Sequence, residues 1–379
     1  MMVDGVMTAR RIVRVAVLPF IIALLTIVSP IRSWAGAEIT FPRPVEAEPN
    51  VQFWIKVFSQ FGYRDFIVHD RGDLTRVYQV MHLPGYGEPG RADVDWTNDY
   101  LKAKYSTILN RLASGAAPAS FEERNVAALF HNPSPQIYAM AAQNLRVQQG
   151  LREQFRDGLL RSRYYRHTME RIFHEAGVPV ELVTLAEVES GFYPKARSSA
   201  GALGIWQFTR GTGRQYMKIN SRYDERLNPV RETEAAAKLL RYNHDVLGDW
   251  PLAITAYNYG TGGTARAAQL YDNNYGRIFK NFDGPHFGFA ARNYYPEFLA
   301  AMQVYRHEND YFPGIENASI APPPETSPVI YHPRHLRRAS YHVRKATYHR
   351  HVRSCTGRCT VAKHTRRVAA RRSADAIRS

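Results

Sequence analysis

The sequence predicts a mainly α-helical protein, and two observations carry this prediction. From Asp95 to about residue 312, apolar residues recur at spacings of three and four, which is the period of an amphipathic helix. Before Asp95, only residues 66–81 resemble β-strands. The chain has 379 residues, 45% of them apolar, so it can bury a core of more than one domain. Its two cysteines exclude a disulfide-stapled miniprotein, and its single long apolar run excludes a multi-span membrane protein.

Residues 1–37 are typical of a secretory signal peptide. Arginines at positions 10, 11 and 14 precede an apolar segment over residues 15–28, and Ala35-Gly36-Ala37 fits a small-residue cleavage site. The apolar segment is short for a membrane span and contains Pro19, although an uncleaved anchor is the alternative. We expect an exported protein of the periplasm or cell envelope. No cysteine stands near the cleavage site, which argues against a lipoprotein.

Residues 38–145 are expected to form a mostly helical N-terminal region with a small β-hairpin. The strand-like runs 66–70 and 76–81 flank a turn-like Arg-Gly-Asp, which indicates the hairpin. Helical spacing then covers residues 97–113, 120–131 and 135–175, and we expect Gly150 and Gly158 to interrupt the last segment.

The stretch from Val178 to Phe192 places an acidic residue on an apolar helix face. Three apolar residues precede Glu189 by seven, four and three positions, so they share its face, whereas Glu187 points to the other side. A carboxylate in that place is either paired with a cation or partly desolvated and protonated, as a general acid requires. The pattern alone favours a structural carboxylate.

Residues 196–208 form a loop of small residues that ends in aromatic ones. Gly201 and Gly204 allow the backbone to approach a neighbour or ligand closely. Trp206 supplies an apolar face and Gln207 an amide, the groups that usually bind a sugar ring. Ordinary core packing is the alternative for Trp206.

Two further helices follow this loop. Asn228-Pro229 is a helix start, and the amphipathic segment that follows ends at Gly248. Residues 250–263 then predict a short helix that carries Tyr257 and Asn258 before a glycine-rich turn. Core packing is again the alternative for Tyr257.

Three motifs in this order resemble the soluble-lytic-transglycosylase-type (SLT) domain of bacterial cell-wall enzymes. They are Glu189-Ser190, Gly204-Ile205-Trp206-Gln207 and Ala256-Tyr257-Asn258. A fourth block, residues 291–298, is similar to the family's Glu-Thr-Arg-x-Tyr-Val segment and keeps Arg292 and Tyr294. The helical segment before the motifs is similar to that of membrane-bound lytic transglycosylase D relatives.

The resemblance implies a goose-lysozyme-like helical catalytic domain over residues 146–312. The family cleaves the β-1,4 bond between N-acetylmuramic acid and N-acetylglucosamine in peptidoglycan, and leaves a 1,6-anhydro sugar. One glutamate suffices, because the C6 hydroxyl of the substrate attacks in place of water. The resemblance implies Glu189 as the acid and base, with neither cofactor nor metal. It implies these substrate-binding residues: Ser190, Trp206, Gln207, Tyr257, Asn258 and Tyr294.

One departure from the family bears on the alternatives. Ala290 stands where many relatives carry a second glutamate, so Glu189 is the only carboxylate expected in the site. A hydrolytic muramidase on the same fold would need another base. A peptidoglycan-binding scaffold would not need the acid. A structural envelope protein is a further alternative, for which only the basic tail is evidence.

The last segments differ in composition from the rest of the chain. Residues 313–330 are rich in proline and are expected to form a linker. Residues 331–379 hold 14 Lys and Arg residues against one acid, Asp375, and are expected to be disordered. In the envelope such a tail favours anionic polymers rather than nucleic acid. Membrane association and the state of Cys355 and Cys359 stay open.

Overall fold

The computed structural model describes residues 40–322. The expected signal peptide and basic tail, with Cys355 and Cys359, lie outside the described residues. The described part is mostly helical with one small sheet, so the predicted fold class is confirmed. No helix within residues 40–322 is both long enough and apolar enough to cross a membrane.

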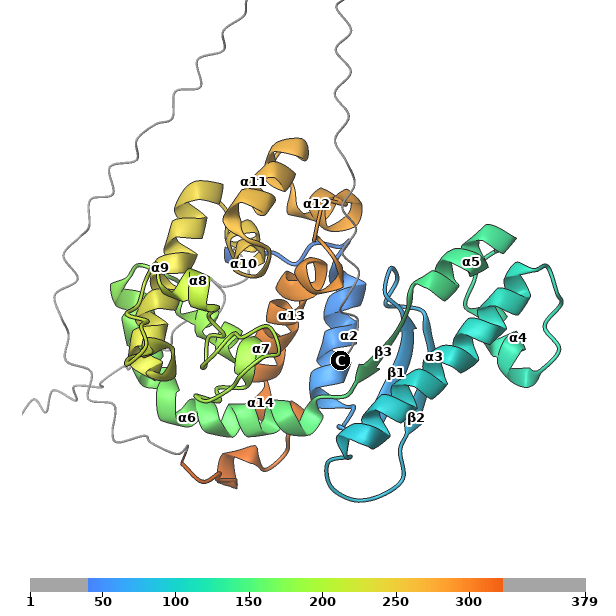
Figure 1. Cartoon of the computed structure of the whole chain (residues 1–379), viewed down its shortest axis with the longest axis horizontal. Coiled ribbons are helices and arrows are strands. Elements are labelled where there is room, and N and C mark those ends of the chain that lie inside the picture. The colour runs from blue at the N-terminus through green and yellow to red at the C-terminus, as the bar shows by residue number, and fades with distance from the viewer. Residues whose placement is uncertain (1–39, 323–379) are drawn as a thin grey trace, which may run out of the picture. The chain divides into compact units, whose positions relative to one another are not determined.

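The described elements follow in chain order (Figure 1). They are α2 (Glu48–Ser59), β1 (Asp65–Asp70), β2 (Val77–His82), α3 (Arg91–Ala113), α4 (Phe121–Ala128), α5 (Pro135–Gln143), β3 (Leu145–Gln149), α6 (Arg152–Glu175), the 3₁₀ helix η1 (Val180–Thr184), α7 (Leu185–Ser190), α8 (Arg210–Gly213), η2 (Glu225–Leu227), α9 (Pro229–Leu247), α10 (Trp250–Tyr259), α11 (Thr261–Leu270), α12 (Tyr275–Asn281), α13 (Phe289–Arg306), α14 (Glu308–Tyr311) and η3 (Ile315–Asn317).

Strand β1 is the centre of a three-stranded antiparallel sheet with the order β2-β1-β3. Phe66 of β1 pairs with Met81 of β2 on one side and with Gln149 of β3 on the other. The predicted hairpin of β1 and β2 is confirmed. Strand β3 lies where the helical pattern over 135–175 was expected to continue. It forms because β1 is buried and its second edge needs backbone partners, which local periodicity does not reveal.

A small core lies between this sheet and the helices α3, α4 and α5. Its buried residues are Phe66, Val68, Tyr78, Leu101, Tyr105, Ile108, Leu109, Leu112, Val126, Phe130, Tyr138 and Ala141.

Helix α4 begins with a complete capping box, in which the Ser120 hydroxyl accepts from the Glu123 N–H and the Glu123 carboxylate accepts from the Ser120 N–H.

A larger core is shared by α2, α6, α7, α9, α10 and α13. Helix α13 packs against α2, α7 and α10, and Figure 1 shows it running between α10 and α2. Helix α9 begins where Asn228 accepts hydrogen bonds from the N–H groups of Val230 and Arg231, and it ends at Gly248, as the sequence predicts.

Helix α2 belongs to the larger core, although it precedes the domain boundary expected at residue 145. Asn50 and Trp54 both donate hydrogen bonds to the side-chain oxygen of Asn293 on α13, at 2.8 and 3.1 Å. Asn293 is fully buried, so this contact fixes the start of α13. The expected boundary itself falls inside strand β3, which pairs with β1. Contacts within residues 40–312 therefore do not follow that boundary.

Residues 315–320, which were expected to belong to a linker, contact α6. Arg163 on α6 donates to the carbonyl oxygen of Ile315 at 2.8 Å, and the Tyr164 hydroxyl donates to that of Ile320 at 2.8 Å. Ile315 is buried, and Ala318 and Ile320 are partly buried against the larger core, so residues 315–320 pack on the rest of the described chain.

Gly158 lies inside α6 and does not interrupt it, contrary to expectation. A Cβ atom at this position would lie 2.1 Å from a carboxylate oxygen of Glu187. The glycine is therefore needed for space against α7. Glu187 itself is buried at this contact, on the side of α7 that faces α6.

Candidate active site

The last turn of α7 presents Glu189. Leu182, Leu185 and Ala186 are fully buried, and Glu189 is half-buried at the end of the same face. The helix ends at Gly191, which adopts the left-handed conformation with φ +56°. The expected helix from Val178 is in fact a 3₁₀ turn, η1, followed by the short α7. The predicted face is nevertheless formed.

Tyr294 of α13 is the direct partner of Glu189. Its hydroxyl donates a hydrogen bond to the Oε1 atom of Glu189. Its ring, 3% exposed, stacks on the ring of Tyr257 from α10, with centroids 6.3 Å apart and planes 5° from parallel. The Tyr257 hydroxyl donates in turn to the carbonyl oxygen of Trp206 at 2.9 Å. Segments far apart in the sequence thus meet at Glu189.

The acid–base properties of Glu189 follow from these surroundings. Burial raises the pKa of Glu189 to about 7, while the hydrogen bond from Tyr294 opposes the rise because it stabilises the ionised form. Near pH 7 the carboxyl group can therefore both donate and accept a proton, as one group must when it serves as acid and then as base.

We predict that Tyr294→Phe raises the pKa of Glu189 further, by about one pH unit, because a hydrogen bond to a charged group is worth about 1.5–3 kcal/mol. A ¹³C NMR titration of the Glu189 carboxyl in the full chain measures this. Tyr257→Phe is the matched control, because its hydroxyl bonds a carbonyl oxygen and not Glu189. Equal pKa values in the wild type and Tyr294→Phe would contradict the prediction.

Glu232, on the first turn of α9, holds the loop that carries Trp206. Its two carboxylate oxygens accept hydrogen bonds from the N–H groups of Ile205 at 2.8 Å and Trp206 at 3.0 Å. Glu232 is only 1% exposed, and burial raises its pKa well above the usual value against the opposing effect of these N–H groups. Sequence reasoning missed this residue. Its position just after the helix start at Asn228 was the available signal.

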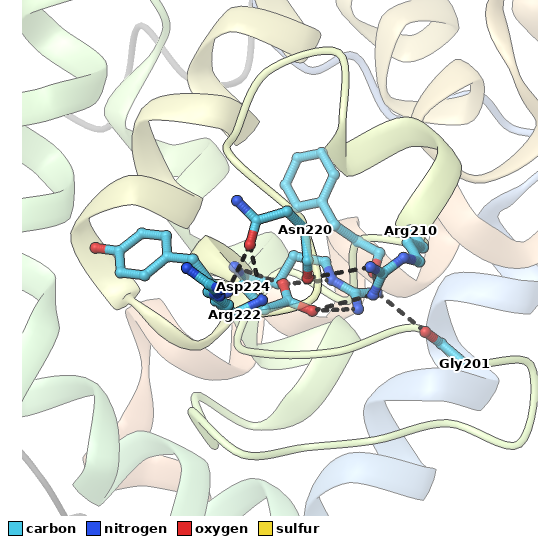
Figure 2. Close-up of polar contacts among 8 residues, drawn as sticks. Gly201, Arg210, Asn220, Arg222 and Asp224 are labelled. Carbon is cyan, nitrogen blue, oxygen red and sulfur yellow. Dashed lines mark hydrogen bonds and ion pairs between the residues drawn. The ribbon is translucent and has the colours of Figure 1, made fainter.

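Arg226 is a second support of the same loop. It is buried, binds Asp224 at 2.7 Å, and donates to the carbonyl oxygens of Gly201 and Phe208 at 3.2 and 3.1 Å. Arg210 approaches the same Asp224 at 3.8 Å. Figure 2 shows Gly201, Arg210 and Asp224 gathered around this network. The loop is thus held by two buried polar side chains, those of Glu232 and Arg226.

The expectation that Trp206 binds substrate does not fit the structure. Its side chain is 0% exposed, its Nε1 donates to the Thr233 hydroxyl at 3.0 Å, and its ring stacks on Phe173 with centroids 5.3 Å apart. A ring enclosed in this way cannot stack on a sugar. The alternative of core packing is the one observed.

Ser190 and Gln207 use their donors within the protein. The Ser190 hydroxyl donates to the carbonyl oxygen of Ile205 at 2.7 Å, which ties the end of α7 to the loop. The Gln207 amide donates to the carbonyl oxygens of Ala196 and Gly204 at 3.2 and 2.8 Å. Both side chains are half-buried, so part of each is still accessible to a ligand.

Asn258 and Glu297 differ in their exposure to solvent. Asn258 is exposed near the end of α10, and no hydrogen bond joins it to Glu189 in the described residues. Glu297, on α13, is half-buried and its charge interacts with that of Glu189. A further acidic residue thus lies near enough to Glu189 for the two charges to interact. The family motif points to position 290, where this chain has alanine, and gives no signal for an acid seven residues later.

Comparison with known proteins defines the class of the domain that carries Glu189. Residues 172–279 match the family model of the Transglycosylase SLT domain. The resemblance predicted from the motifs is confirmed over these residues. The residues that match are mostly helical, as the predicted fold class requires.

The relatives include a lytic murein transglycosylase and a putative resistance protein. Membrane-bound lytic murein transglycosylase D of Escherichia coli K12 is 34% identical over 157 residues, which are 41% of this chain and 34% of that protein. A putative tributyltin chloride resistance protein of Alteromonas sp. M-1 is 35% identical over 98 residues, 25% of this chain and 47% of that protein. The chain thus spans less than half the length of these curated relatives.

One solved structure is similar as well. The X-ray structure of an inactive mutant of the lytic transglycosylase Slt from Pseudomonas aeruginosa has 18% sequence identity and a TM-score of 0.32. The match covers 52% of this chain and 29% of that one.

Proposed function

We propose that this protein is a peptidoglycan lytic transglycosylase. It cleaves the β-1,4 bond between N-acetylmuramic acid and N-acetylglucosamine and leaves 1,6-anhydromuramoyl ends. The observation that carries this proposal is the half-buried Glu189, hydrogen-bonded by Tyr294 and with a pKa of about 7, within a match to the SLT domain.

In the proposed reaction Glu189 starts protonated. It donates its proton to the leaving glycosidic oxygen as the bond from C1 to that oxygen breaks. The 2-acetamido group of the substrate stabilises the positive charge at C1. The C6 hydroxyl then attacks C1, and Glu189 accepts its proton. Tyr294 contributes most while Glu189 is ionised, because its hydroxyl donates to the carboxylate.

The substrate-binding roles are proposed for the residues that keep accessible surface. Ser190 and Gln207 would bind near the scissile bond, and Tyr257 and Asn258 would position the acetamido group. Trp206 supports the loop from within the core instead of touching sugar.

A digest of purified peptidoglycan with the protein tests the proposal. Mass spectrometry of the released muropeptides should show ends that are lighter by one water than reducing ends, which is the anhydro form. Release of no muropeptide at all would favour a peptidoglycan-binding scaffold and contradict the enzyme proposal.

Hydrolysis is the second candidate reaction, because a second acidic residue, Glu297, interacts electrostatically with Glu189. A muramidase needs an ionised carboxylate to activate water. Burial and the charge of Glu189 raise the pKa of Glu297 to about 8, so it is mostly neutral at pH 7 and a poor base. Ordinary reducing ends in the same digest would show hydrolysis all the same.

We also propose that the protein acts in the cell envelope. The sequence of residues 1–37 indicates export, and one relative is by name a membrane-bound murein transglycosylase. Peptidoglycan lies in that compartment, so the proposed substrate and location agree.

A further inference from the structure

Helix α13 brings a second acid into the site. Glu297 follows Tyr294 by three residues, and side chains at this spacing are neighbours on a helix surface. Tyr294 already contacts Glu189 through its hydroxyl, and Glu297 is half-buried beside it. The charges of Glu297 and Glu189 interact, and Glu297 also acts on Tyr294. Glu297 therefore lies near Glu189, one helical turn from Tyr294 on α13.

Several charged groups act on Glu297, and they determine its protonation. Burial and the negative charge of Glu189 raise its pKa, while Arg146 of β3 lowers it. The Arg146 guanidinium lies over the ring of Phe289, 4.3 Å from its centre. The charge of Glu189 also raises the pKa values of Glu232, Tyr257 and Tyr294. The net effect is a carboxyl group that keeps its proton at neutral pH.

The O–H group of this acid has no hydrogen-bond partner in the part of the chain that the structure describes. Among residues 40–322 no hydrogen bond or ion pair to the Glu297 carboxyl is observed, whereas Glu189, Glu232 and Glu153 each accept at least one hydrogen bond. A neutral carboxylic acid is both a donor and an acceptor. Such a donor, half-buried next to the proposed acid, is suited to an uncharged oxygen of a ligand.

We propose that Glu297 is a substrate-binding residue, which donates its carboxyl O–H to an oxygen of the glycan next to Glu189. This inference rests on the proposed function. The glycan offers hydroxyl and acetamido oxygens as acceptors, and a protonated acid binds them without placing a second negative charge beside Glu189. Ionised Glu297 would lose the donor and would repel the carboxylate that Glu189 becomes during the reaction.

Binding of purified, peptide-free glycan strands tests the proposal, measured by calorimetry between pH 5 and pH 9. Full-length Glu189→Gln serves as the parent, because it does not turn over the ligand. Its affinity should fall about tenfold as the pH rises and Glu297 ionises, which corresponds to one hydrogen bond of about 1.4 kcal/mol. In the parent this fall begins below pH 8, because the charge of Glu189 no longer raises the pKa.

Two double variants separate donor from charge. Glu189→Gln with Glu297→Gln keeps a donor that cannot ionise, so its affinity should be high and independent of pH. Glu189→Gln with Glu297→Ala has no donor and should bind weakly at every pH. Thermal unfolding of each protein shows whether it is folded.

The outcomes distinguish the inference from the proposed function. If the Glu297→Gln variant shows the same pH dependence as the parent, or if the Glu297→Ala variant binds as tightly, the role of Glu297 is refuted while glycan binding stands. If none of the three folded proteins binds glycan at any pH, both the inference and the proposed substrate are refuted.

Discussion

Glu189→Gln should abolish turnover of peptidoglycan and leave the fold intact. Glutamine keeps the shape of the side chain and can still accept the hydrogen bond from Tyr294, but it has no proton to donate. General acid–base catalysis contributes about 10²–10⁴-fold, and here one residue performs both proton transfers. We therefore expect a loss in kcat of at least about 10²-fold, with an unchanged unfolding temperature.

Glu187→Gln is the matched control for this variant. Glu187 lies two residues earlier on the same short helix, and burial raises its pKa well above the usual value, which favours the neutral form. An amide in its place changes little in charge, and turnover should be retained. Near-normal turnover by Glu189→Gln, measured by release of anhydromuropeptides, would refute the assignment of the acid.

Gly204→Ala should destabilise the protein by about 3 kcal/mol or more. Gly204 has φ +88°, a conformation that costs an alanine about 1–2 kcal/mol. In addition, its Cβ atom would lie 2.0 Å from the carbonyl oxygen of Arg226 and 2.4 Å from both carboxylate oxygens of Glu232. Overpacking of this kind costs about 1–3 kcal/mol, and the backbone oxygen cannot turn away.

Gly201→Ala separates the two contributions. Gly201 is in the same loop and has φ +79°, but a Cβ atom at this position would have no neighbouring atom within 4 Å. Only the conformational cost of about 1–2 kcal/mol is expected there. Urea unfolding of both variants measures the difference. Equal losses of stability would mean that the contact with Arg226 and Glu232 contributes nothing.

The fold class and the central acid could be predicted because their signals are local. The spacing of three and four along the chain needs no knowledge of partners, and Glu189 follows its apolar face by fixed helical steps. Tyr294 was found through a short motif. The structure places its hydroxyl on Glu189 although 105 residues separate the two.

The features that were missed depend on contacts between distant segments. Strand β3 forms because it pairs with the free edge of β1. The sequence of residues 145–149 alone does not distinguish a strand from a helix. In the sequence, Glu232 is an ordinary acidic residue in the first turn of a helix. Only its contact with the N–H groups of the loop reveals that it holds the loop in place. Trp206 is a residue type that often stacks on sugar rings. Only its packing against Phe173 in the structure shows that its ring is enclosed.

The contact between α2 and Asn293 has a consequence for how this protein can be divided. The residues that match the SLT family end at 279, before α13, and begin after α2. A fragment cut to that match would lack Tyr294, and one extended through α13 would still lose the two donors that satisfy buried Asn293. A piece that keeps these contacts of the candidate site therefore exceeds the recognisable domain at both ends. It must carry residues from far upstream of that domain.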